Sequence, residues 1–470
     1  MLSYMTEYHF NSNTIIDLRD AFNNVFLNSY QFNEKIYKAF NQAYSACLTT
    51  FLQNDNYLMK DLPQLEKLLR SRVGDVFNEK FREEEFVTIL SNTVASYSEL
   101  AKRTGFGNAY QYMSNLLSVW NNDVLEPIRD TLWRTPSQKI QELEKYSLFH
   151  YKMNADGGNT NSTTSSDKTI LRTTNNMTPL LVVYAFINRH YILDLLPEVS
   201  VIRNLSKHGF DIYATDWGTP SAYDKDLTIG HFVNSYMDKA VDLIRKNTNS
   251  DKVSLFGYCW GGNLVLMYAA LHPKKVKTVV TIATPGDFSA DNTLLSLWTR
   301  NVKVDTLLDA FGNAPSMLLN AAFSLRNPIE NIHKYPHFFE QPHGLESTME
   351  FFATETWLYD SPPVIGEIYR EFVKYCYQKN LFIKNQMEIY DSSGSSHLID
   401  LKNIIAPFLN VIAQKDDLVA PSSSIALNNA VGSRDKNMIE SPSGHVGLII
   451  GQRAHKEVWP KVASWLKDRS

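Results

Sequence analysis

A cysteine flanked by glycines stands in the stretch Lys252–Gly262, which reads KVSLFGYCWGG. The spacing around Cys259 matches the pattern Gly-x-Ser-x-Gly, in which a nucleophile occupies a sharp turn between a strand and a helix, with sulfur replacing the serine oxygen. Gly257 and Gly261 leave the space that such a turn needs, and the N-terminus of a helix stabilises a thiolate. The alternative is a buried structural cysteine in a glycine-rich turn. The preceding strand, the spacing and the following helix together favour Cys259 as a catalytic nucleophile.

A carboxylate and a histidine follow two later strands, in the chain order that this kind of site requires. The buried strand predicted at Phe408–Ala413 leads into Asp416 and Asp417, and a short strand near Asn437–Ile439 leads into His445. Either residue type, alone in a loop, is more often simply solvated. Their positions after the expected strands favour Asp416, rather than its neighbour, as the residue that orients the imidazole. His445 is then the base that removes the thiol proton.

Backbone amides near the nucleophile are expected to stabilise the negative charge that develops on the substrate oxygen. One donor is the N–H of Trp260, the residue after the nucleophile. The other is expected from the loop after the strand predicted at Leu180–Phe186, near Ile187 and Asn188. We take Asn188 as the second donor of this oxyanion hole.

The second half of the chain has the pattern of a sheet that could position these residues. Continuous apolar runs predict buried strands that alternate with helices, which is typical of a doubly wound parallel sheet. More than a hundred residues separate the strands predicted at Val276–Ala283 and Phe408–Ala413. An insertion of that size predicts a lid, which we place at about residues 287–379. The predicted strands are Leu180–Phe186, Phe210–Thr215, Val253–Phe256, Val276–Ala283 and Phe408–Ala413, with helices around Leu196–His208 and Phe232–Lys246.

The first part of the chain has a different pattern. From about residue 14 to residue 128 the apolar residues recur at helical spacing, as at Ile15, Leu18, Phe22, Val25 and Phe26. We therefore predict an all-helical N-terminal region over residues 1–145 and a catalytic domain over residues 146–470. The helices either cover a core of their own or pack on a partner.

Composition and charge argue against several classes of protein. The 46 Lys and Arg residues against 50 Asp and Glu give a net charge of −4, which provides no field to hold a nucleic acid. No apolar run approaches the roughly 18 residues of a membrane span, and no secretory signal is recognisable at the start. We expect a cytoplasmic protein whose three cysteines are free thiols. His333 and His337 are separated by Pro336, which argues against a helical metal site.

From about Tyr146 to its end, the chain resembles the polyhydroxyalkanoate synthases, and is most similar to the short catalytic subunits of class III. Two positions depart from the family's pattern: Asp417 stands where the family usually has histidine, and Trp260 stands where close relatives carry a smaller or polar residue. The resemblance rests on the turn, the acid and the histidine, and on the segments Leu181–Arg189, Asp216–Pro220, Thr284–Phe288, Trp357–Pro362, Asp400–Ile404 and Lys456–Val458.

The resemblance implies an α/β-hydrolase fold with a lid. It also implies the transfer of (R)-3-hydroxyacyl groups, above all 3-hydroxybutyryl groups, from coenzyme A to a growing polyester, with Cys259, Asp416 and His445 as the triad. No cofactor or metal is implied, because the coenzyme A thioester is the substrate. The expected location is the surface of cytoplasmic polyester granules. Homodimers, and an accessory helical subunit, are the expected partners, and the additional N-terminal residues are the expected place of association.

Two other functions are weighed against this resemblance. A cysteine-dependent hydrolase of the dienelactone hydrolase or thioesterase kind has the same glycine-flanked turn. Such hydrolases are usually much shorter and lack a lid, and the segment Asp216–Pro220 also argues against them. A granule-coating or scaffold protein without activity has no need of all three triad residues.

Overall fold

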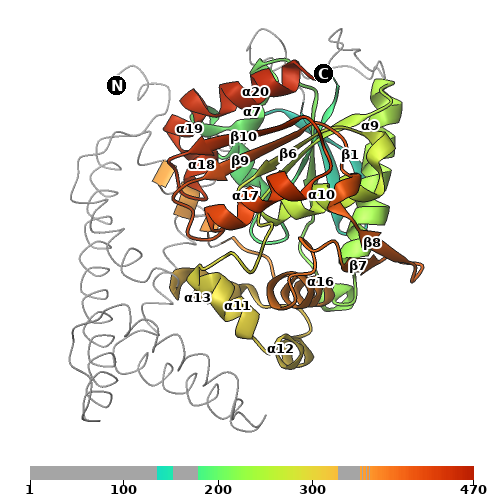
Figure 1. Ribbon diagram of the computed structural model, residues 1–470, viewed down its shortest axis with the longest axis vertical. Helices are drawn as coiled ribbons and strands as arrows, with labels where there is room; N and C mark the ends of the chain where they lie inside the picture. Colours follow the sequence, from blue (N-terminus) through green and yellow to red (C-terminus); the bar gives the residue numbers. More distant parts are fainter. Residues whose placement is uncertain (1–134, 152–177, 326–349, 352, 356, 359) are drawn as a thin grey trace, which may run out of the picture. The chain divides into compact units, whose positions relative to one another are not determined.

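A computed structural model describes residues 135–151, 178–325 and 350–470, apart from 352, 356 and 359 (Figure 1). These residues belong to one compact unit, which comprises residues 127–326 and 344–470. The helices predicted before residue 129 lie outside the described residues. So do the three histidines His333, His337 and His343 and the thiol of Cys47.

Within the described ranges, eight strands form a central sheet in the order β1-β2-β4-β3-β5-β6-β9-β10. The pairs β1–β2 and β2–β4 are antiparallel, and every following pair is parallel. The strands are β1 (Ser137–Leu143), β2 (Tyr146–Tyr151), β3 (Leu180–Val183), β4 (Ile212–Asp216), β5 (Val253–Tyr258), β6 (Val276–Ile282), β9 (Phe408–Ala413) and β10 (Lys436–Ser441). All five strands expected from the apolar runs are confirmed within a few residues of their predicted bounds.

Helices cover both faces of the sheet, because its central strands are apolar on both sides. Every residue of β5 and of β9 is buried. Figure 1 shows α7 and α20 on one face of the sheet and α10 and α17 on the other. The helices of this core are α7 (Val201–Lys207), α8 (Ile229–His231), the π-helix η5 (Phe232–Met237), α9 (Asp238–Thr248), α10 (Trp260–Leu271), α17 (Pro421–Ala430), α18 (Gly447–Ile450), α19 (Gln452–Glu457) and α20 (Trp459–Lys467).

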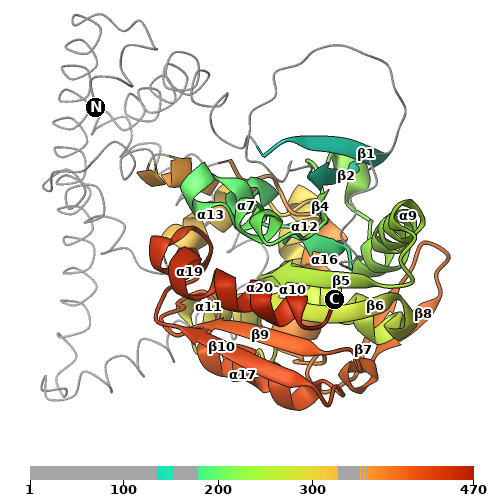
Figure 2. The ribbon, with the colours of Figure 1, turned by 90° about the horizontal axis from the view of Figure 1, so that it is seen from above.

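The insertion between β6 and β9 begins with helices, as the length of that interval predicts. Its helical elements lie together in Figure 1, to one side of the sheet. They are α11 (Leu294–Asn301), α12 (Val304–Phe311), α13 (Ser316–Leu325), α16 (Gly366–Glu371) and the π-helix η7 (Phe372–Gln378). After η7 the chain forms a hairpin of β7 (Met387–Tyr390) and β8 (Ser396–Ile399), visible at the edge of Figure 2, before it returns to β9.

Short 3₁₀ helices connect several of these elements. They are η2 (His190–Asp194), η3 (Pro197–Val199), η4 (Ala222–Asp224), η6 (Pro273–Lys275) and η8 (Leu401–Asn403). Among the described residues, no helix is both long enough and apolar enough to cross a membrane.

The boundary expected at residue 145 differs from the structure. Residues 137–143 form β1, whereas the sequence pattern assigned them to a helical region. β1 is an edge strand that pairs only with β2 among the described strands, and its residues are mostly exposed or half-buried. An edge strand with polar residues on both sides lacks the apolar run that identifies buried strands, so the pattern did not reveal it. The predicted boundary therefore falls inside the β1–β2 hairpin.

Candidate active site

Cys259 occupies the turn between β5 and α10, with φ 55° and ψ −129°. Residues other than glycine rarely adopt positive φ, and such strained positions cluster at functional sites. The backbone N–H of Cys259 donates to the carbonyl of Ile282 at the end of β6, at 2.9 Å. The turn is therefore fixed to the neighbouring strand, and it holds the sulfur beyond the carboxyl end of the sheet.

The turn requires glycines because other atoms of the protein lie where a Cβ atom would be. A Cβ atom at Gly257 would lie 2.5 Å from the carbonyl oxygen of Gly261, and a Cβ atom at Gly261 would lie 2.2 Å from the carbonyl oxygen of Val183. A Cβ atom at Gly262 would meet the hydroxyl of Thr284 at 1.8 Å. The first turn of α10 thus lies directly against β3 and the segment after β6.

The carboxylate of Asp416 is buried in the loop after β9, and its two oxygens have separate contacts. Oδ1 accepts the backbone N–H groups of Leu418 and Val419, each at 2.9 Å, which fixes the loop. Oδ2 lies 2.7 Å from Nδ1 of His445. The neighbouring Asp417 has an exposed side chain. The structure thus brings Asp416 to the histidine, as the sequence order predicts.

His445 lies between the carboxylate and the thiol, and only 5% of it is exposed. Its ring is hydrogen-bonded to Asp416, and Cys259 is near enough to interact with it electrostatically. Burial alone lowers the pKa of a histidine, but the negative charges of Asp416 and Cys259 outweigh burial and raise the pKa of His445 to about 10. The raised pKa favours the imidazolium form of His445, which interacts with both Asp416 and Cys259.

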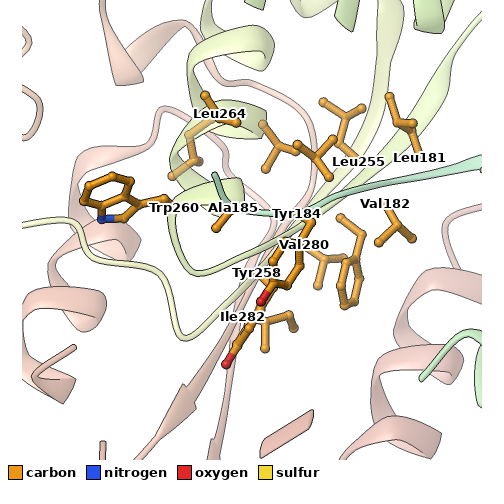
Figure 3. Close-up of a cluster of buried hydrophobic side chains, with 14 of the residues drawn as sticks. Leu181, Val182, Tyr184, Ala185, Leu255, Tyr258, Trp260, Leu264, Val280 and Ile282 are labelled. Carbon is orange, nitrogen blue, oxygen red and sulfur yellow. The ribbon is translucent and has the colours of Figure 1, made fainter. Parts of the chain in front are cut away.

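Tyr258 connects the nucleophile turn to the histidine loop. Its hydroxyl donates to the backbone carbonyl of His445 at 3.3 Å, and the two rings lie 5.0 Å apart. Figure 3 shows Tyr258 next to Tyr184, both at the carboxyl ends of their strands. Burial, and then the negative charge of Cys259, raise the pKa of Tyr184, so its buried hydroxyl stays neutral beside the sulfur.

The insertion between β6 and β9 contacts the residue that follows the nucleophile. The indole ring of Trp260 stacks on Phe372 of η7, with ring centroids 4.0 Å apart and an angle of 6° between the planes. The ring of Tyr377, also in η7, lies near the indole as well, with ring centroids 6.3 Å apart. Trp260 also opens α10, so its backbone N–H is at a helix N-terminus, where the first N–H groups lack partners within the helix.

Comparisons with known proteins agree with this arrangement. The family model described as alpha/beta hydrolase fold matches residues 178–452. The poly(3-hydroxyalkanoate) polymerase subunit PhaC of Thiocystis violacea is 40% identical over 62% of this chain and 81% of its own length. The protein of the same name from Synechocystis sp. is 38% identical over 62% of this chain and 78% of its length. That from Haloferax mediterranei is 35% identical, over 72% of this chain and 65% of its length.

The chain belongs to the poly(3-hydroxyalkanoate) polymerase family. The resemblance expected from the sequence is therefore confirmed, and so is the α/β-hydrolase fold of the core. As a poly(3-hydroxyalkanoate) polymerase, the chain is an acyltransferase.

Several features of this polymerase site were not predicted from the sequence. Tyr258 stands next to the nucleophile in the sequence, but its hydrogen bond to His445, which lies 187 residues away, has no local pattern that reveals it. The contact of Trp260 with Phe372 depends on how the insertion between β6 and β9 packs, which no local pattern shows. Among the described residues, no group of three or more His, Cys, Asp and Glu side chains is arranged to hold a metal ion. Cys376 is a free, fully buried thiol that contacts Met387.

Proposed function

We propose that this chain polymerises (R)-3-hydroxyacyl-coenzyme A, with 3-hydroxybutyryl-coenzyme A as the main substrate, and releases coenzyme A. Cys259 is the nucleophile, His445 the acid–base residue and Asp416 the residue that orients it. The observation that carries the proposal is the hydrogen bond between Asp416 and His445, with His445 interacting electrostatically with Cys259 at the strand–helix turn of a polymerase-family chain.

Acylation begins when the proton of the Cys259 thiol passes to His445, whose raised pKa favours the imidazolium form, and a thiolate is left at Cys259. The sulfur attacks the carbonyl carbon of the substrate thioester, and the bond from that carbon to the coenzyme A sulfur breaks. The departing coenzyme A thiolate takes the proton from His445. One thioester replaces another, so the acyl group stays activated, whereas a serine nucleophile would convert it to a less reactive ester.

Elongation uses the neutral histidine that acylation leaves. Once the sulfur is part of a thioester, its negative charge no longer raises the pKa of His445. The imidazole takes the proton from the 3-hydroxyl of a second acyl group, and the alkoxide attacks the carbon attached to Cys259. An ester bond forms, the carbon–sulfur bond breaks, and the initial pair of thiolate and imidazolium returns. The second acyl group is still bound to coenzyme A, so the lengthened thioester acylates Cys259 again by the first step.

The backbone N–H groups of Trp260 and Asn188 are the proposed donors to the oxyanion of each step. The position of Trp260 at the first residue of α10 supports its role. The loop of Asn188 follows β3, which lies next to β5 in the sheet. Water must be kept from the acyl-enzyme, since hydrolysis competes with elongation, and we propose the lid at about residues 287–379 as the cover.

We further propose that the enzyme works at the surface of polyester granules, as a homodimer or with an accessory helical subunit. The names of the relatives from Haloferax mediterranei and Thiocystis violacea support association, because they describe those proteins as subunits. The region before the described residues is the proposed place of contact.

One assay tests the proposed activity. The purified chain is incubated with 3-hydroxybutyryl-coenzyme A, and three products are followed: free coenzyme A, insoluble polyester and free 3-hydroxybutyrate. The proposal predicts that coenzyme A release is matched by polyester. Release matched by free acid would instead identify a hydrolase, and the absence of release would contradict both enzymatic functions.

A further inference from the structure

Two lid residues hold the loop that carries the proposed second oxyanion donor. The indole N–H of Trp357 donates to the backbone carbonyl of Arg189 at 2.7 Å. The hydroxyl of Ser361 donates to the side-chain carbonyl of Asn188. Trp357 is 3% exposed, so water cannot easily replace its hydrogen bond. Both contacts join segments that are about 170 residues apart in the chain.

A third lid residue, Asp360, is bound from the same loop. Its Oδ1 lies 3.4 Å from Nε of Arg189, and its Oδ2 accepts the hydroxyl of Tyr191 at 2.9 Å. The guanidinium of Arg189 also donates to the carbonyl of Gly218 at 3.2 Å and to the hydroxyl of Thr219 at 2.9 Å. Arg189 therefore connects the lid segment to the loop after β4, and the oxyanion loop is held from both sides.

The geometry of this loop matters for the nucleophile. Asn188 has φ 63°, a left-handed conformation that asparagine tolerates but does not prefer, so external contacts help to keep it. The loop starts where β3 touches the first turn of α10, and Figure 3 shows Ala185 beside Trp260. A shift of the loop would therefore change the distance between its N–H groups and the carbonyl that Cys259 attacks.

We propose that Trp357, Asp360 and Ser361 are positioning residues for the oxyanion hole, so that the lid is part of the catalytic scaffold as well as a cover. This inference rests on the proposed acyl transfer at Cys259. Oxyanion donors stabilise a transition state only when they are preorganised near 2.7–3.1 Å from the charged oxygen. A lid that has moved away from this loop would leave the nucleophile intact and the donor displaced.

The test compares two reactions of the same sulfur in the full chain. Acylation by 3-hydroxybutyryl-coenzyme A, measured in a single turnover, develops an oxyanion. Alkylation of Cys259 by iodoacetamide, measured by peptide mass spectrometry, needs the thiolate but develops no oxyanion. The variants are Trp357→Phe, which keeps an aromatic ring without the N–H, and Ser361→Ala. The matched controls are Trp298→Phe, elsewhere in the lid, and Ser361→Thr, which keeps the hydroxyl.

The proposal predicts that Trp357→Phe and Ser361→Ala slow acylation by about 10- to 100-fold, the range that a displacement of about 1 Å can cost. Alkylation of Cys259 should keep its wild-type rate, and both controls should acylate as the wild type does. Acylation at the wild-type rate in both variants would overturn the proposal. So would an equal loss in acylation and alkylation, because that would indicate general damage to the site. A wild-type chain that releases no coenzyme A would instead refute the proposed function.

Discussion

At the scale of single residues, Asp416 and Asp417 offer a direct comparison of two adjacent carboxylates. The side chain of Asp416 is buried against His445, whereas that of Asp417 is exposed. We predict that Asp416→Asn lowers the elongation rate by about 10²- to 10⁴-fold, the contribution of general acid–base catalysis. Acylation should fall less, because the thiolate can form without a strong base. Asp417→Asn is the control, and a larger loss in that variant would place the acid one residue later.

The raised pKa of His445 predicts a dependence of stability on pH. Its folded pKa, about 10, lies above the ordinary value of 6.5, so the stabilisation is complete below about pH 6.5 and is lost as pH rises towards 10. Asp416→Asn removes the largest contribution that raises this pKa. The difference in unfolding free energy between the wild type and this variant should therefore be larger at pH 6 than at pH 9.5 in urea titrations. A difference that grows with pH would contradict the assignment.

The positions of Cys259 and Asp416 at the ends of their strands could be predicted from the sequence, because apolar runs reveal those strands. Asp416 after Phe408–Ala413 is such a case. The residues that support the site could not be predicted in this way. Trp357 contacts Arg189 across 168 residues, and neither position has a local pattern that indicates the other.

At the scale of elements, the turn from β5 into α10 depends on glycines that face backbone atoms. A Cβ atom at Gly261 would lie 2.2 Å from the carbonyl oxygen of Val183, in a strand that cannot move easily. Gly261→Ala should therefore lower the free energy of unfolding by about 1–3 kcal/mol or more, as overpacking does. Gly447→Ala is the control, since its Cβ atom would lie 3.8 Å from Ser443. Equal stabilities of the two variants in urea would show that the turn adapts.

The parallel strands of the core could be predicted because burial on both faces leaves continuous apolar runs. β5 and β9 illustrate this, since every one of their residues is buried. β1 was missed because an exposed edge strand need not be apolar. The insertion between β6 and β9 was recognised only as an interval too long for a loop, since its packing on Trp260 and Arg189 is a tertiary feature.

At the scale of the whole molecule, the position of a truncation matters for testing the proposed association. The compact unit of the described residues begins at residue 127. Thr135 donates to Asp194 and accepts from Arg203, so a cut at residue 140 would damage the core and remove half of β1. A deletion of residues 1–126 leaves these contacts in place. We predict that it lowers the number of chains per particle, obtained from the molecular mass in light scattering divided by the mass of one shortened chain, and an unchanged number of chains would contradict the proposal.

The central claim is that the growing polyester is attached to Cys259. The most direct measurement is mass spectrometry of the peptide containing Cys259, after a short reaction with 3-hydroxybutyryl-coenzyme A and an acid quench. Cys259→Ala is the control, because it removes one sulfur and leaves the fold. We predict a series of thioester-linked 3-hydroxybutyryl oligomers on the wild-type peptide, and neither adducts nor polymer with the variant. Polymer formed by the variant, or by a wild-type chain whose Cys259 stays unmodified, would contradict it.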